Sequence, residues 1–109
     1  MYGTGTAMME DTRLPIEDES MIDAQRLGAI IRGARHRARY VDMSDLVGAM
    51  QRKTGMRWHE HTLYTVEQGK RLPNLNMLLA LMVTLDLTMD ELVSAVHEES
   101  REAVRKLLR

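Results

Sequence analysis

The chain has 109 residues, of which 44% are hydrophobic and 28% charged, so it is long enough for one domain with a modest core. No apolar run approaches the ~20 residues that cross a bilayer, which excludes a membrane-spanning helix. The sequence contains no cysteine, which excludes disulfides and cysteine nucleophiles. Residues 1–23 carry a net charge of −5, residues 24–71 carry +6 and residues 72–109 carry −2. A basic centre between acidic ends is typical of a polyanion-binding surface.

The first 22 residues predict a flexible acidic arm, because they are polar, contain Pro15 and show no apolar period. They also lack the pattern of a signal peptide, so we expect a cytoplasmic protein. A first helix is expected to begin near Ser20 or Asp23. One face of this helix is rich in arginine, and the other carries apolar residues at helical spacing, namely Leu27, Ile30, Ile31 and Ala34.

Two further helices are expected around a glycine turn. Asp42 is a good N-cap for the second helix, which Gly55 should end. A third helix is predicted from Trp58 to Gln68, followed by Gly69. Trp58, Leu63 and Val66 are expected to point inward.

The fourth helix is predicted over residues 75–85, with Asn74 as its cap. It is apolar almost all round, so we expect it to be the buried central element, with Leu79 in the core. Thr88 to Glu91 form a capping box that starts a fifth helix, expected to run from Met89 to about Leu108. The fold class is therefore all-α.

The predicted fifth helix carries a heptad seam with one polar break, formed by Met89, Val93, Val96, Ser100, Ala103 and Leu107. Two interpretations are open. The seam either packs on its own domain as part of one long helix, or it forms a contact between two copies of the chain.

Residues 55–73, GMRWHEHTLYTVEQGKRLP, form the second half of a helix-turn-helix pattern. They resemble the recognition helix and exit turn of the Cro/C1-type (XRE) family in Thr62-Leu63, Val66, Glu67, Gly69, Lys70-Arg71 and Pro73. The first helix of that family resembles Leu27-Gly28-x-x-Ile31-Arg32-x-x-Arg35, and residues 74–92 are similar to its fourth and fifth helices. The chain departs from the family in Met43, which replaces a Gln, and in a lengthened second helix and turn between Leu46 and Gly69.

The resemblance implies a five-helix lambda-repressor-like DNA-binding domain at residues 23–95, preceded by the acidic arm at 1–22. Residues 96–109 would extend the last helix as a candidate dimer contact. The implied function is a sequence-specific transcriptional regulator, a repressor that binds an operator in double-stranded DNA as a homodimer, without cofactor or enzymatic activity. The alternative is a protein-interaction module of the same fold, antitoxin-like or polymerase-binding, without DNA readout of its own.

Under the DNA-binding interpretation, the outer side of the third helix carries the residues that contact bases. The candidates are His59, Glu60, His61, Tyr64, Thr65 and Gln68. The candidates for phosphate contacts are basic residues on the first helix and around the third, namely Arg35, Arg37, Arg39, Arg57, Lys70 and Arg71. His59 and His61 diverge on a helix because they are two residues apart, so no metal site is expected.

Overall fold

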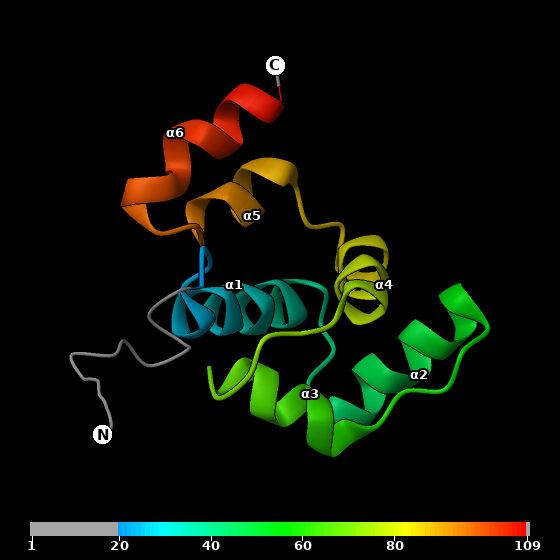
Figure 1. Ribbon diagram of the computed structural model, residues 1–109. Helices are drawn as coiled ribbons and strands as arrows, with labels where there is room; N and C mark the ends of the chain where they lie inside the picture. The colour runs from blue at the N-terminus through cyan, green and yellow to red at the C-terminus, as the bar shows by residue number, and fades with distance from the viewer. Residues whose placement is uncertain (1–19, 109) are drawn as a thin grey trace, which may run out of the picture.

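The computed structural model describes residues 20–108, and this part of the chain is all-helical, with six α-helices and no strand (Figure 1). The expected flexible arm therefore lies outside the described residues over positions 1–19. Between residues 20 and 108, no helix combines the length and the apolar content that crossing a membrane requires. The helices are α1 (Ala24–Arg37), α2 (Met43–Thr54), α3 (Glu60–Glu67), α4 (Leu75–Leu85), α5 (Met89–Ser94) and α6 (Glu98–Leu107).

Side-chain caps begin several helices where the sequence predicts them. The Asp23 carboxylate accepts hydrogen bonds from the first backbone N–H groups of α1, and Asn74 Oδ1 accepts one from Met77 N at 2.8 Å at the start of α4. Thr88 and Glu91 form the expected capping box of α5. These local signals fixed the helix starts because each cap satisfies backbone donors that lack a partner within the helix.

The start of α3 differs from the prediction. The helix begins at Glu60, so Trp58 lies in the preceding turn, half-buried against the core. Trp58 Nε1 donates a hydrogen bond to Thr54 Oγ1 at 3.0 Å, which ties the turn to the last residue of α2. An indole held in this way stabilises the long connection between the two helices.

The prediction of one helix from Met89 to Leu108 was wrong, because the helix is interrupted between α5 and α6. The segment before α1 runs antiparallel to residues 95–97, with Ile22 bridged to Val96. Asp23 N donates to the Ala95 carbonyl and His97 N donates to the Met21 carbonyl, both at 2.8 Å. His97 has a non-helical ψ of 145° in this pairing, so residues 96–109 do not extend the last helix as a continuous element.

The core lies where α1 and α2 each pack against both α3 and α4. Its largest fully buried side chains are Leu27, Ile31, Leu46, Met50, Leu63, Leu81 and Val66. Ile22, which was assigned to the flexible arm, also packs against this core. The folded region therefore begins before residue 23.

The α4 helix has the predicted bounds but not the predicted burial. Leu81 is fully buried, whereas Leu79 is 53% exposed. The expectation that Leu79 belongs to the core was therefore wrong. A helix with no charged residue shows no polar side in its sequence, so the pattern alone did not reveal which face is exposed.

Candidate nucleic-acid interface

The α3 helix is anchored through a buried ion pair on its inner side. Arg35 Nε donates to Glu67 Oε2 at 2.7 Å, and Arg35 Nη2 donates to Glu67 Oε1 at 3.1 Å. The remaining donor, Arg35 Nη1, binds the carbonyls of Tyr40 and Val41 at 2.9 and 2.8 Å. One guanidinium thus joins α1, α3 and the turn that leads to α2, in the fork geometry that arginine offers to a carboxylate.

The expectation that Arg35 contacts phosphate is therefore corrected. Its side chain is only 9% exposed, and its donors are directed to Glu67 and to backbone carbonyls. The hydrogen bonds to Glu67 raise the pKa of Arg35, against the opposing effect of its burial. The residue remains charged and positions α3 instead of facing a ligand.

Two glycines allow α1 and α3 to approach this closely. A Cβ at Gly28 would lie 2.5 Å from the carbonyl oxygens of Val66 and Glu67. Gly69 follows α3 with a left-handed φ of 75°, and a Cβ there would lie 2.7 Å from the Cα of Gln25. Only glycine fits these positions without moving the backbone, so the end of α3 lies directly against α1.

The outer side of α3 is polar and accessible. His61, Tyr64 and Gln68 are exposed and follow one another at three- and four-residue spacing, so they share one face. His59 and Glu60 are exposed at the start of the helix. These side chains offer hydrogen-bond donors and acceptors, and Tyr64 adds an aromatic ring.

Thr65 is at the edge of this face. It is half-buried, and its hydroxyl donates a hydrogen bond to the Thr62 carbonyl at 2.7 Å. Its hydroxyl is thus used within the helix, which leaves the methyl group as the part available for an apolar contact.

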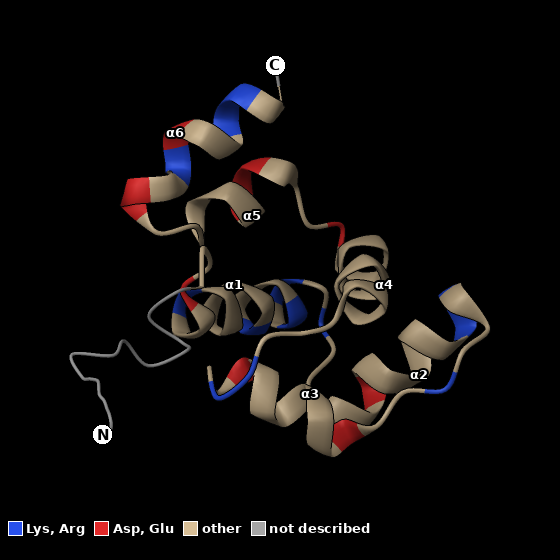
Figure 2. Cartoon of the chain, in the orientation of Figure 1, with Lys and Arg blue, Asp and Glu red and all other residues tan. Residues whose placement is uncertain are grey.

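Exposed cations lie on both sides of α3. Arg57 precedes the helix, and Lys70 and Arg71 follow it. Figure 2 shows blue segments on the connection between α2 and α3 and on the loop that follows α3. The structure therefore brings three of the predicted phosphate candidates to the same helix as the predicted base contacts.

Two other arginines that were predicted to contact phosphate, Arg37 and Arg39, lie away from α3. Arg37 Nη2 donates to Glu91 Oε2 at 3.0 Å, so its side chain points to α5. Arg39 is exposed in the turn after α1, with a left-handed φ of 67°. Neither arginine lies on the α1 face that adjoins α3.

The face of α1 that does adjoin α3 carries two residues outside the predicted set, Arg32 and His36. Both are exposed, and they line a shallow groove together with Gln25 of α1 and Gln68 of α3. Arg32 Nε lies 3.6 Å from Glu67 Oε1. Their spacing from Gly28, at i+4 and i+8, could have identified them, because Gly28 marks the side of α1 that meets α3.

This arrangement has the chemistry of a polyanion-binding surface, with a polar helix face between cationic ends and a further arginine beside it. Within residues 20–108, histidine and acidic side chains do not gather into a group able to hold a metal ion. No family model, curated protein or solved structure matches the chain. Its function is accordingly inferred from the residues of α1 and α3 themselves.

Proposed function

We propose that the chain is a sequence-specific DNA-binding protein of the helix-turn-helix type, in which α2 and α3 form the motif and α3 enters the major groove. The observation that carries the proposal is the accessible row of His61, Tyr64 and Gln68 between Arg57 and the Lys70-Arg71 pair. The five-helix lambda-repressor-like fold and the acidic arm belong to the same proposal.

Each part of the surface has a distinct role in this proposal. The side chains of His61 and Gln68 offer donors and acceptors to base edges, and such contacts provide sequence preference. The three flanking cations bind phosphates, which fixes the position of α3 without reading sequence. Arg32 extends the cationic side along α1.

In the cell, the protein would act as a transcriptional repressor by occupying an operator. Two copies on an inverted repeat would place two α3 helices in successive major grooves on one side of the duplex.

The proposal is tested by measuring the binding of the 109-residue protein to a random-sequence duplex at increasing salt concentration. Phosphate contacts predict that the logarithm of the binding constant falls linearly with the logarithm of the salt concentration, with a slope of about −0.9 for each phosphate neutralised. Arg71→Ala should weaken binding to all duplexes alike and reduce the magnitude of that slope by about one.

Arg37→Ala is the matched control, because Arg37 is paired with Glu91 away from α3 and should leave the slope unchanged. Absence of duplex binding at low salt would contradict the proposal. It would favour the protein-interaction module as the function of this fold. Duplex binding that does not respond to Arg71→Ala would instead contradict the assignment of Arg71 to a phosphate contact.

A further inference from the structure

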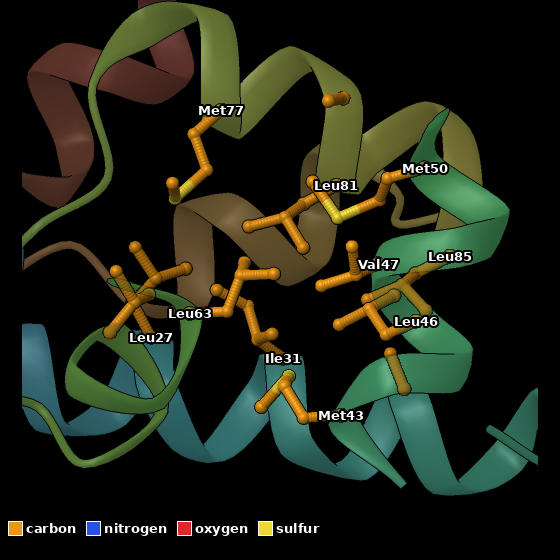
Figure 3. Packing of buried hydrophobic residues seen from close by; sticks show 14 residues of the cluster. Leu27, Ile31, Met43, Leu46, Val47, Met50, Leu63, Met77, Leu81 and Leu85 are labelled. Carbon is orange, nitrogen blue, oxygen red and sulfur yellow. The ribbon is translucent and has the colours of Figure 1, made fainter. Parts of the chain in front are cut away.

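A line of large apolar side chains lies exposed along the outer side of α4. Leu75, Leu79 and Val83 are 69%, 53% and 59% exposed. They stand at i, i+4 and i+8, so they follow one face of the helix. Figure 3 shows the opposite face of α4, where Met77, Leu81 and Leu85 point into the core. The exposed line therefore lies opposite the side that packs in the core.

The helix that carries this line has no charged residue, although exposed charged residues flank it in the sequence, Arg71 before Leu72 and Asp86 at its C-cap. Residues 75–85 contain no Lys, Arg, Asp or Glu, although 28% of the whole chain is charged. Leu78 and Met82 are half-buried beside the line, and Leu72 is 39% exposed in the turn before α4. Contiguous apolar surface of more than a few hundred Å² is uncommon on monomeric proteins and marks contact sites.

We propose that this face of α4, from Leu75 to Val83, is the surface through which two copies of the chain form a homodimer. Antiparallel packing of α4 on α4 about a two-fold axis beside Leu79 would place Leu75 of one copy against Val83 of the other. The line is self-complementary in this arrangement, as a two-fold interface requires.

The absence of charge is the reason for assigning a second copy as the occupant. Any charged group near a two-fold axis meets its own copy with the same sign, so a neutral face suits self-association. A neutral apolar face also offers nothing to a charged partner such as nucleic acid. The α4 face therefore complements itself better than it complements the polyanion assigned to α3.

The C-terminal helix α6 is the competing surface. None of its residues is buried, and it exposes Leu107 (82%) and Leu108 (47%). However, its sequence EESREAVRKL is dense in charged residues, with Arg105 and Lys106 directly before Leu107. An antiparallel contact between two α6 helices would rest on charge pairs between its acidic start and its basic end and not on an apolar face, so Leu107 serves as the control position.

A contact that rests on three exposed side chains in one line predicts a weak dimer in free solution. A stable interface covers ~800 Å² on each partner, whereas a patch of a few hundred Å² belongs to the small, transient class. On an operator with two half-sites, the second copy would bind next to the first at a high effective concentration. This last step rests on the proposed function, but the position of the contact does not.

The test is sedimentation of the full chain without DNA, from low micromolar to high hundreds of micromolar concentration. We expect a concentration-dependent dimer. Leu79→Glu should weaken it by about tenfold or more in Kd, a change of about 1.4 kcal/mol for each tenfold. Leu107→Glu should leave the dimer unchanged. Thermal melts monitored by circular dichroism check that both variants fold, and Val83→Lys provides a second disruption of the same line.

Mixing two charge variants tests the axis itself. Leu79→Glu and Leu79→Lys should each be monomeric alone and should associate when combined, because opposite charges then meet at the axis. A wild-type chain that stays monomeric throughout would overturn the proposal. It would also be overturned by a dimer that survives Leu79→Glu, by one that is lost with Leu107→Glu, or by charge variants that do not associate when mixed.

The outcome is separable from that of the DNA-binding proposal. A monomeric wild-type chain with steep salt-dependent duplex binding would refute the α4 contact and leave the proposed function intact. A dimer that depends on Leu79 but has no affinity for duplex would do the reverse.

Discussion

The α3 and α4 helices contribute to one core, but their outer faces differ in polarity. Leu63 and Val66 of α3 and Leu81 of α4 are buried in the same cluster. On the outside, α3 presents polar side chains such as His61, whereas α4 presents apolar ones such as Leu79. The inner faces form the core, and the outer faces are the surfaces to which we assign binding partners.

The two helices are also held in different ways. Besides the packing of Leu63 and Val66, the short α3 helix has an ion pair, in which the buried Glu67 carboxylate binds Arg35 of α1. The α4 helix relies on apolar packing along its inner side. Substitutions on the inner side of either helix should therefore change stability, while substitutions on the outer side should change association.

The largest expected effect is the loss of the buried ion pair of α3. Glu67→Ala would leave the Arg35 guanidinium buried without its counter-ion, which should lower the free energy of unfolding by about 3–5 kcal/mol. Arg37→Ala, which removes the exposed pair with Glu91, should lower it by no more than about 1 kcal/mol. Urea unfolding of both variants checks the contrast, and equal effects would show that Glu67 does not anchor α3.

A pair of leucines on α4 sharpens the distinction between its two faces. Leu81→Ala should lower the free energy of unfolding by about 2–5 kcal/mol, because the side chain is fully buried. Leu79→Ala should lower it by less than about 1 kcal/mol at protein concentrations too low for the proposed dimer, because the side chain is half-exposed. Similar losses in chemical denaturation would mean that Leu79 is covered within a single copy.

The smallest expected effect lies at the start of α5, away from both outer faces. The backbone hydrogen bond from Thr88 is the main cause that lowers the pKa of Glu91, and the charge of Arg37 adds to it. A lowered pKa stabilises the fold at pH values above the unfolded value of ~4.3 and loses this effect as the pH falls through the folded value.

Glu91→Gln should therefore be less stable than the wild type at neutral pH, by less than about 1 kcal/mol because the pair with Arg37 is partly exposed. Thermal melts at a series of pH values should show the difference shrinking toward zero below pH ~4. A difference that grows as the pH falls would contradict the assignment.

Most of the helix bounds follow from the sequence because their signals are local. The Asn74 cap and the apolar run after it predict α4 as observed, and Gly55 ends α2 with a left-handed φ of 71°. The exposed residues of α3 also follow from the inward positions of Leu63 and Val66. In each case the determining residues are neighbours along one helix.

The parts that the sequence did not predict depend on contacts between distant residues. Arg35 looks like one more cation on a basic helix face until Glu67, 32 positions away, is placed beside it. The break between α5 and α6 arises because residues 95–97 pair with the segment before α1. The exposure of Leu79 depends on which side of an uncharged helix faces the core, and helical periodicity does not contain that information.

The most direct test of the account is whether the outer face of α3 carries sequence preference. Binding sites are first selected from a random duplex pool, and the affinity of the wild type and of His61→Ala is then measured for the selected site and for a scrambled duplex. We expect His61→Ala to lose about 1–3 kcal/mol on the selected site alone, with unchanged stability and little change on the scrambled duplex. Full discrimination by His61→Ala, or an equal loss on both duplexes, would contradict the assignment of His61 to sequence readout.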